Sequence, residues 1–531
     1  MVLKALQAHK MEALWEGPFT VQDHLGAVNY LIAFPTSNRK PKVYHINSLK
    51  SFYSRELKVC QFTAQGRDDA EWPEGVYDEG KSDGGVEEVN LSMTLGHMHQ
   101  QQIKELCTSY TPMFSATPGL TEQAYHSIVT GNAHPIRAQP YRVSPLAKTA
   151  IDLEIQDMLQ MGVIRPSGNA WASPVVLVPK PDGEICFCVD YRKLNAVTRP
   201  DNYPMACTDE LLEKLGRAQF ISTLELTKGY WQVPLDESAK ERSAFTTHVG
   251  LYEFNVLPFR QGNAPVSFQR LVDGLLVGLG EYAVAYLYDV AILSDSWAEH
   301  LEHLQKLFEC LREARLTVKA KKCQIGLNRV TYLGHQVGQG TINTLQAKVD
   351  TIQKWPVPKS KKQVQSFLGL ARYYRRFVPQ YSQIAAPLSD LTKKEQPNAV
   401  QWTEECQKAF NQLKVTLMSD PVLRAPDFDK PFLVTTDASE HGVGAVLMQE
   451  GQNQEFHPVV FLSKKLSERE SHWSISEKEC YAIVYALEKL CPYVWGQRFH
   501  LQTDNAALQW LHTTTGNNKK TYLVEFSSPR F

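Results

Sequence analysis

The sequence predicts a multidomain α+β protein with a small β-barrel at its N-terminus. Its 531 residues correspond to about three to five domains at roughly 100 to 200 residues per domain. Hydrophobic residues make up 43% of the chain and aromatic residues 10%, enough to fill several cores, which excludes global disorder. From Gln139 almost to the end, strand patterns and helix patterns alternate densely, which favours sheets covered by helices.

Three segments precede this dense region. Residues 1–60 hold short strand patterns separated by turn residues, and a small β-barrel is the natural arrangement. These patterns lie at Met11–Trp15, Phe19–Val21, Val28–Phe34 and Val43–Ile46. Residues 61–94 are expected to form a disordered linker, because nine acidic and two basic residues between positions 64 and 90 leave little apolar surface to bury. Residues 95–138 are predicted to form a helical lead-in.

Composition also bears on the compartment. The most apolar stretch, residues 275–293, contains Glu281 and Asp289, so we expect no membrane span. Charged residues interrupt the first turns of the chain, which predicts an intracellular protein, in the nucleus or the cytoplasm. The ten cysteines form no CxxC pair, so we expect buried thiols and no zinc site.

A basic stretch spans residues 351–388, although the whole chain has a formal charge of only −1. It contains no acidic residue and seven cations, namely Lys354, Lys359, Lys361, Lys362, Arg372, Arg375 and Arg376. Phe367, Tyr373, Tyr374 and Phe377 are interleaved with them, and cations with aromatic rings suit phosphate contact and base stacking. The alternative is a solvated helix face whose aromatic residues pack inward.

Two carboxylates are predicted to lie at strand ends. Residues 283–293 form two apolar runs, which predicts a hairpin that presents Tyr286 to Asp289 at its turn. Residues 220–235 predict a strand that ends at Glu225. Carboxylates from two strands can hold a divalent metal for phosphoryl transfer, whereas solvated acidic residues at strand ends are the alternative.

A series of sequence blocks runs through residues 141–334. They are Tyr141-Arg142, Met161-Gly-Val-Ile-Arg-Pro166, Trp171-Ala-Ser-Pro-Val-Val-Leu-Val-Pro-Lys-Pro-Asp-Gly183, Val189-Asp-Tyr-Arg-Lys-Leu-Asn195, the Glu225 segment, Leu257-Pro-Phe259, Asn263-Ala-Pro265, Phe268-Gln-Arg270 and Tyr332-Leu-Gly334. These blocks look like the reverse transcriptase of the Pol polyprotein of gypsy-type long-terminal-repeat retrotransposons, and the resemblance covers residues 95–512. It implies a right-hand polymerase, with fingers and palm at 139–318 and thumb and connection at 319–424, which binds template-primer and deoxynucleotides. The segment from Ser366 to Phe377 resembles the thumb and connection, which favours nucleic-acid binding by the basic stretch.

The chain departs from this family at the polymerase site. The family holds its catalytic metals with one Asp in the strand block and two in a Tyr-x-Asp-Asp hairpin, whereas this chain has Glu225, Tyr288 and Asp289. A phenol is neutral at pH 7 and binds magnesium poorly, so we expect impaired polymerisation. Cys186 stands where the family has a triphosphate-clamping arginine, and Arg260 replaces a glycine, where we expect it to crowd the pocket.

Two residues implied to bind the nucleotide are retained. The resemblance places Lys180 on the fingers, and Tyr230 as an aromatic gate against the ribose 2′-hydroxyl. A core aromatic is the alternative for Tyr230.

A second set of acidic residues follows in residues 425–531. Asp437 lies near the end of an apolar strand pattern, Glu479 on a helix and Asp504 at the end of another strand pattern. This order resembles the ribonuclease H domain of the same family, a mixed sheet, and implies that Asp437, Glu479 and Asp504 bind two Mg²⁺ (or Mn²⁺) ions and cleave the RNA strand of an RNA-DNA hybrid. Alternatively, Glu479 caps its helix with Ser476, which has capping-box spacing.

The same family supplies two further expectations about the ends of the chain. Its fourth metal-binding Asp has no counterpart after Asp504, so we expect the last strand and helix to be missing and a sheet edge to be uncovered. Residues 15–21 and 43–50 resemble the small DNA-binding barrel of the integrase, without the integrase's catalytic core or a protease motif. The sequence thus favours a ribonuclease H with doubtful polymerase activity. A catalytically silent nucleic-acid binder and an inactive relic are the alternatives, and the oligomeric state stays undetermined.

Overall fold

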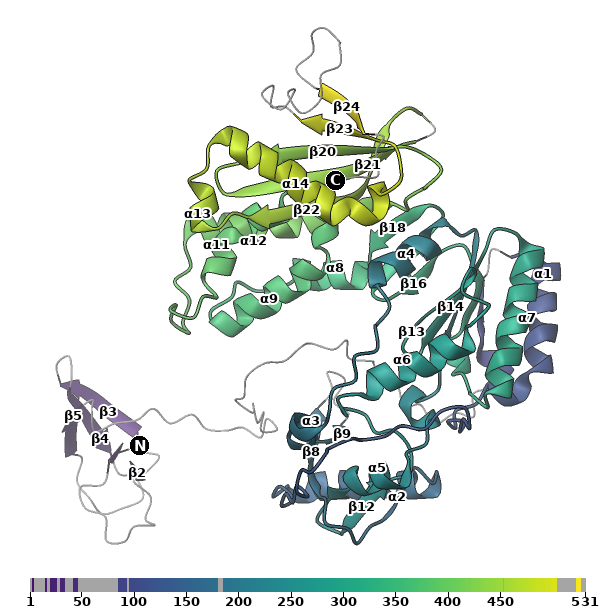
Figure 1. The fold of residues 1–531 in the computed structure, drawn as a ribbon. Coiled ribbons are helices and arrows are strands. Elements are labelled where there is room, and N and C mark those ends of the chain that lie inside the picture. Colours follow the sequence, from purple (N-terminus) through teal and green to yellow (C-terminus); the bar gives the residue numbers. More distant parts are fainter. Residues whose placement is uncertain are drawn as a thin grey trace. The chain divides into compact units, whose positions relative to one another are not determined.

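The computed structural model describes residues 2–3, 15–16, 20–25, 29–33, 42–45, 85–92, 95–179, 185–419, 421–451, 453–503 and 522–526. The chain divides into two units, residues 1–80 and residues 81–531, and each is described by itself. Figure 1 shows their helices and strands.

The first unit contains a three-stranded antiparallel sheet in the order β3-β4-β5. These strands are Thr20–Leu25, Asn29–Ala33 and Lys42–His45, and a further pair consists of β1 (Val2–Leu3) and β2 (Trp15–Glu16). The register places Tyr30 opposite both His24 and Tyr44. The predicted strands are thus found where residues are described, and closure into a barrel stays a prediction.

The second unit begins with short elements that pack against the palm. They are η2 (Val86–Glu88), β6 (Asn90–Leu91), α1 (His97–Ser109) and η3 (Thr111–Met113). Strand β6 pairs in parallel with β15 (Gln324–Leu327), so residues 86–91 belong to an ordered sheet edge and the predicted linker extends too far. The rest of that linker lies outside the described residues. Helix α1, whose Ile103 and Cys107 are buried, lies at the start of the predicted helical lead-in, whereas residues 114–138 contain no helix.

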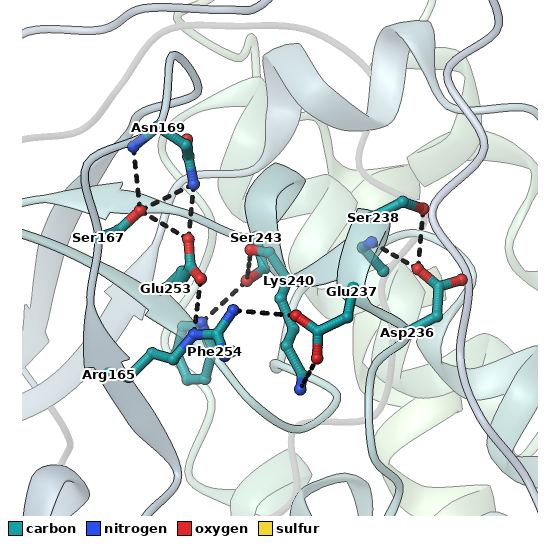
Figure 2. Close-up of polar contacts among 11 residues, drawn as sticks. Arg165, Ser167, Asn169, Asp236, Glu237, Ser238, Lys240, Ser243, Glu253 and Phe254 are labelled. Atoms are coloured by element: carbon teal, nitrogen blue, oxygen red, sulfur yellow. Dashed lines mark hydrogen bonds and ion pairs between the residues drawn. The ribbon is translucent and has the colours of Figure 1, made fainter.

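The fingers region is built on a sheet with the strand order β7-β12-β11-β8-β9. Its elements are α2 (Pro145–Gln160), β7 (Ile164–Pro166), β8 (Ser173–Pro179), β9 (Ile185–Val189), α3 (Arg192–Val197), α5 (Glu237–Arg242), β11 (Phe245–Thr246) and β12 (Leu251–Phe254). Figure 2 shows how a buried carboxylate, Glu253, joins strands and loop. It accepts hydrogen bonds from Arg165 Nε at 2.8 Å and from Ser167 Oγ and Asn169 Nδ2 at 2.6 Å each. These donors offset the cost of burying its charge.

The palm region carries a sheet with the order β13-β14-β10-β15-β6. Its elements are α4 (Thr208–Arg217), β10 (Phe220–Glu225), η4 (Gly229–Gln232), α6 (Ala264–Leu275), β13 (Ala283–Tyr286), β14 (Asp289–Ser294), α7 (Trp297–Glu313), η5 (Ala320–Lys322) and β15. Strands β10, β13, β14 and β15 pair antiparallel, which confirms the predicted palm and the hairpin. Strand β15, which pairs with β10, reaches Leu327, beyond residue 318, and the boundary of the palm stays a prediction.

The thumb and connection region combines a small antiparallel sheet with helices. The sheet order is β16-β17-β18-β19, with strands Val330–Tyr332, His335–Gly338, Thr341–Thr344 and Val422–Arg424. The helices are α8 (Gln346–Gln353), α9 (Lys361–Tyr373), η6 (Arg375–Phe377), α10 (Tyr381–Ile384), α11 (Ala386–Asp390) and α12 (Glu404–Met418). Phe367, Tyr374 and Phe410 fill the core between them.

The C-terminal region is a five-stranded mixed sheet in the order β22-β21-β20-β23-β24. Its elements are β20 (Phe432–Ala438), β21 (Gly442–Glu450), β22 (Phe456–Lys465), α13 (Glu468–Ser471), α14 (Ile475–Val494), β23 (Phe499–Thr503) and β24 (Tyr522–Phe526). Helix α14 lies across β20 and β21 in Figure 1, and its predicted apolar stripe, including Ala482 and Leu490, is buried there. Strand β24 pairs antiparallel with β23, so the edge that we expected to be uncovered carries a strand.

The described cysteines are all free thiols, but their burial is mixed. Four are buried, Cys207 is exposed and the others are half-buried, so the expectation of buried thiols holds fully for four of the nine described cysteines. Among the described residues, no helix is both long enough and apolar enough to span a membrane.

Candidate active sites

The palm places two carboxylates directly opposite each other. Strand β10 ends at Glu225 and β14 begins at Asp289, and these two residues are register partners in the antiparallel ladder. Opposite residues in such a ladder have Cβ atoms roughly 4.5–5.5 Å apart. Burial, and then the charge of Glu225, raise the pKa of Asp289 from 3.8 to about 7, while Lys322 opposes this shift. The prediction that Glu225 and Asp289 lie at strand ends is confirmed, and the structure adds that they are opposite each other.

The hairpin turn beside Asp289 is held by a buried glutamine on α6. Leu287 adopts a left-handed conformation with φ 55°, and its backbone N–H donates to Gln269 Oε1 at 2.7 Å. Gln269 Nε2 donates to the carbonyl of Ala285 at 3.2 Å, and the residue has no exposed surface. Sequence reasoning missed this role, although Gln269 lies inside the block Phe268-Gln-Arg270.

Tyr288 occupies the turn next to the carboxylate pair. Burial, and then the charges of Asp289 and Glu225, raise its pKa to about 12, so the phenol is neutral at pH 7. A Cβ on Gly229 would lie 2.9 Å from the Tyr288 Cβ, so the turn approaches η4 closely and tolerates only glycine there. The donor set of the palm is therefore two carboxylates, which suits one divalent ion completed by phosphate and water oxygens.

The predicted nucleotide-binding residues have contrasting surroundings. Tyr230 is only 8% exposed, and its ring packs against Phe259, Phe268 and Tyr288, as the core alternative expects. Its role as a gate stays a prediction. Lys180 lies outside the described residues.

The structure describes both positions, Arg260 and Cys186, at which we expected a weakened nucleotide site. Arg260 is exposed and has φ 68°, a conformation that favours the glycine of the family. Cys186 lies on β9, with its Sγ 3.5 Å from the Sγ of Cys188.

The C-terminal sheet brings together two of the three predicted nuclease residues. Asp437 is exposed at the end of β20, and Glu479 on α14 is only 3% exposed. The backbone N–H of Ala438 donates to Glu479 Oε1 at 3.1 Å, so the helix carboxylate lies against the strand beside Asp437. Asp504 lies outside the described residues.

Glu479 does not cap its helix. Helix α14 begins at Ile475, and Ser474 forms the capping box with Glu477, so the alternative in which Glu479 caps the helix with Ser476 is wrong. Because another glutamate serves the cap, Glu479 is left to face the sheet.

A second contact on Asp437 comes from the connection. Gln380 precedes α10 with φ 50°, and its Nε2 donates to Asp437 Oδ2 at 2.9 Å. The neighbouring Ser382 N–H donates to Ser463 Oγ on β22 at 2.9 Å, which fixes this loop against the sheet. The sequence carried no signal for the contact, because Gln380 and Asp437 are 57 positions apart.

The basic stretch is exposed in part. Lys362, Arg372 and Arg375 are exposed and Lys361 is half-exposed. Arg376 is only 7% exposed and pairs with Asp209 and Glu213, so its prediction as a nucleic-acid contact is wrong. Of the interleaved rings only Tyr373 is exposed, so the alternative of inward packing holds for the other three, which are Phe367, Tyr374 and Phe377.

Across the part of the chain that the structure describes, no group of three or more His, Cys, Asp and Glu side chains is placed to hold a metal ion. Each site offers a pair of described carboxylates, Glu225 with Asp289 and Asp437 with Glu479. Carboxylate oxygens are the ligands that Mg²⁺ and Mn²⁺ favour, so both pairs are chemically compatible with such an ion.

Comparisons with known proteins match two segments of the chain to families. Residues 178–337 match a family model of reverse transcriptase (RNA-dependent DNA polymerase), and residues 402–501 match one of the RNase H-like domain found in reverse transcriptase. The chain is 38% identical over 398 residues to the retrovirus-related Pol polyprotein from transposon 297 of Drosophila melanogaster, covering 74% of this chain and 37% of that protein. It is 35% identical over 413 residues to that from transposon gypsy of the same organism, covering 74% and 39%.

A similar solved structure is the foamy viral protease-reverse transcriptase in complex with an RNA/DNA hybrid. The TM-score is 0.70 with 25% sequence identity, over 80% of this chain and 57% of that chain. The chain spans about two fifths of the length of the curated relatives described above.

Proposed function

We propose that this chain, which matches reverse transcriptase and RNase H-like domain models and is similar to Pol polyproteins of retrotransposons, cleaves the RNA strand of RNA-DNA hybrids, with RNA-directed DNA polymerisation impaired. The observation that carries the proposal is the contact between Glu479 and the backbone beside Asp437. It keeps two acids of the required type together, whereas the palm has a neutral phenol at position 288.

Each residue of the proposed nuclease site has a distinct role. Asp437, Glu479 and, by sequence, Asp504 would hold the divalent ion, which when bound activates water and stabilises charge on the phosphate. Glu479 is buried, so its carboxylate is held in one place by Ala438. Asp437 is exposed and can meet a duplex, and the Gln380 amide orients its carboxylate.

The palm is proposed to polymerise poorly for a chemical reason. Glu225 and Asp289 alone would hold a single ion, whereas stabilising both the attacking and the leaving oxygen of a phosphoryl transfer is the task of a two-metal site. The exposed Arg260 side chain and the Cys186 thiol add to the deficit at the nucleotide.

The test is cleavage of a labelled RNA-DNA hybrid by the purified chain in Mg²⁺ or Mn²⁺, beside primer extension. We expect cleavage, and a loss of roughly a thousandfold in Asp437→Asn, because a metal ion contributes several kcal/mol to the transition state. Glu440→Gln is the matched control, an exposed acid three residues away. Wild-type cleavage no faster than that of Asp437→Asn would refute the proposal.

A silent nucleic-acid binder is the second candidate, favoured by the exposed cations of the basic stretch and by the RNA/DNA hybrid in the similar foamy viral complex. Changing Lys362, Arg372 and Arg375 together to Ala should weaken hybrid binding. The slope of log Kobs against log[salt] should become shallower by up to about 0.9 for each phosphate that is no longer neutralised. The control changes Lys104, Lys306 and Arg312, which are exposed cations on α1 and α7. Equal affinity of the two triple variants would exclude the basic stretch as the binding surface.

A further inference from the structure

Three parts of the second unit meet at one buried polar junction. Glu213 lies on palm helix α4, Arg376 on η6 of the connection and Tyr493 near the end of α14 on the C-terminal sheet. Glu213 Oε1 accepts a hydrogen bond from Tyr493 Oη at 2.6 Å and another from Arg376 Nη2 at 3.0 Å. Arg376 Nη1 also donates to Asp209 Oδ1 at 2.7 Å. One carboxylate oxygen thus joins the palm to both other regions.

The burial of this junction makes it depend on docking. Glu213 is 6% exposed and Arg376 is 7% exposed. A buried charge is strongly unfavourable unless a partner and hydrogen bonds compensate it. The partners of Glu213 come from segments 163 and 280 positions away, so its charge is compensated only while all three regions are packed together.

Aromatic contacts continue the junction across the segment that leads into the C-terminal sheet. The ring of Phe428, between β19 and β20, stacks on Tyr493 with centroids 6.4 Å apart and an interplanar angle of 5°. The Arg217 guanidinium, also from α4, lies 4.8 Å from the centroid of Phe428. A second palm side chain therefore contacts the C-terminal region at the same place.

We propose that Glu213, Arg376 and Tyr493 form a latch that fixes the RNase H-like domain against the palm and so sets where a bound hybrid is cut relative to the palm. These three are positioning residues, since none belongs to either carboxylate pair. The part of this inference that concerns cutting rests on the proposed function, whereas the docking part does not.

The experiment uses the full chain and Tyr493→Phe, which removes only the hydroxyl and keeps the ring against Phe428. The matched control is Tyr485→Phe on the same helix, whose hydroxyl donates to Ser463 O at 3.3 Å within the C-terminal region. Hydrogen-exchange mass spectrometry should show faster exchange in residues 209–217 and 425–431 of Tyr493→Phe, on the order of tenfold, because the variant lacks a hydrogen bond to a buried charge. Tyr485→Phe should leave both segments unchanged.

A second variant tests whether the three residues act as a unit. Glu213→Gln keeps an acceptor for Tyr493 but removes the charge that faces Arg376, so it should also speed exchange in both segments. The double variant should show less than the product of the single effects, because the residues share one network. Multiplicative effects, or exchange in Tyr493→Phe equal to that of the wild type, would overturn the latch.

The cutting role has a separate measurement. On a hybrid with a recessed DNA 3′ end, the wild type should cut the RNA at one dominant distance from that end, and Tyr493→Phe at several. Unchanged positions despite faster exchange would overturn the spacing role. If the wild type does not cut at all while exchange still rises in Tyr493→Phe, the latch stands and the proposed nuclease activity fails.

Discussion

The palm and the C-terminal sheet each bring two carboxylates together, but by different means. In the palm, Glu225 and Asp289 are partners in one ladder, and burial, followed by the charge of Glu225, raises the pKa of Asp289. In the C-terminal sheet, Asp437 comes from a strand and Glu479 from a helix, and each has its own hydrogen-bond donor, Gln380 Nε2 and Ala438 N–H. Burial therefore disfavours the charged form of Asp289 in the palm, whereas Asp437 and Glu479 each accept a hydrogen bond from a named protein group.

The largest expected effect would separate the roles of the two pairs. Glu479→Gln should lower hybrid cleavage at least about a hundredfold and leave the fold intact, because the amide oxygen still accepts from Ala438 N–H. Cleavage rates measure the loss of activity, and thermal unfolding measures whether the fold is intact. Glu477→Gln, at the exposed cap of the same helix, is the control. Full activity of Glu479→Gln would show that this pair does no chemistry.

Restoring the palm acids should make the two sites more alike. Glu225→Asp with Tyr288→Asp places a third carboxylate beside Asp289, so the unfolding midpoint in EDTA should fall by several degrees and recover with Mg²⁺. Primer extension should rise at least about tenfold over the parent. Tyr288→Phe adds no carboxylate, so it should neither lower the unfolding midpoint in EDTA nor increase primer extension. If primer extension does not rise, the impaired polymerisation would instead be assigned to Cys186 and Arg260.

The strain in the palm pair should be visible as a pH dependence of stability. The pKa of Asp289 is about 7 in the folded chain against 3.8 for an ordinary Asp. The folded state then binds more protons between these values, so stability falls as pH rises from 4 to 7, by at most ~1.4 kcal/mol per pH unit. Asp289→Asn should flatten this slope in urea titrations, while Asp295→Asn, exposed beyond the same strand, should not. Identical slopes of stability against pH in the wild type and both variants would show that Asp289 is not electrostatically strained.

The smallest effect concerns the donor of the nuclease pair. Gln380→Ala removes the amide on Asp437 Oδ2, and we expect kcat for hybrid cleavage to fall roughly threefold to tenfold with KM unchanged, since the variant lacks one hydrogen bond to a charged group. Gln383→Ala, whose amide donates to Gly442 O at 3.3 Å, tests for loosening of the loop alone. Equal losses in both variants would assign the effect to packing.

The sequence predicted those features that depend on neighbours along the chain. The strand ends at Glu225 and Asp289 follow from local apolar patterns, and the buried stripe of α14 follows from helical periodicity. The nuclease pair was predicted from motif order, and the structure adds the contact through Ala438. The sequence left the alternative cap at Ser476 open because Ser474 and Ser476 both have a glutamate three residues later, and only the folded geometry distinguishes them.

Features that depend on distant contacts were missed. Arg376 was counted among exposed cations because charge density says nothing of burial, and its partners lie more than 160 positions earlier. Gln269 and Gln380 carry no charge pattern that marks them. Strand β24 was unexpected because its segment does not resemble the family, although a strand needs only a compatible edge to pair with.

The pairing of β10 with β14 also determines which kinds of sequence change the palm tolerates. Six consecutive residues pair without a bulge, from Phe220 opposite Ser294 to Glu225 opposite Asp289. Side chains alternate between the two faces of a sheet, so inserting or deleting one residue within either strand would turn one acid to the opposite face and draw a core residue into solvent. A substitution that keeps the chain length, such as a change at position 288, would leave this pairing in place. The palm would therefore keep its fold when single acids are substituted. A one-residue insertion or deletion, in contrast, would disrupt both the strand pairing and the pair of facing acids.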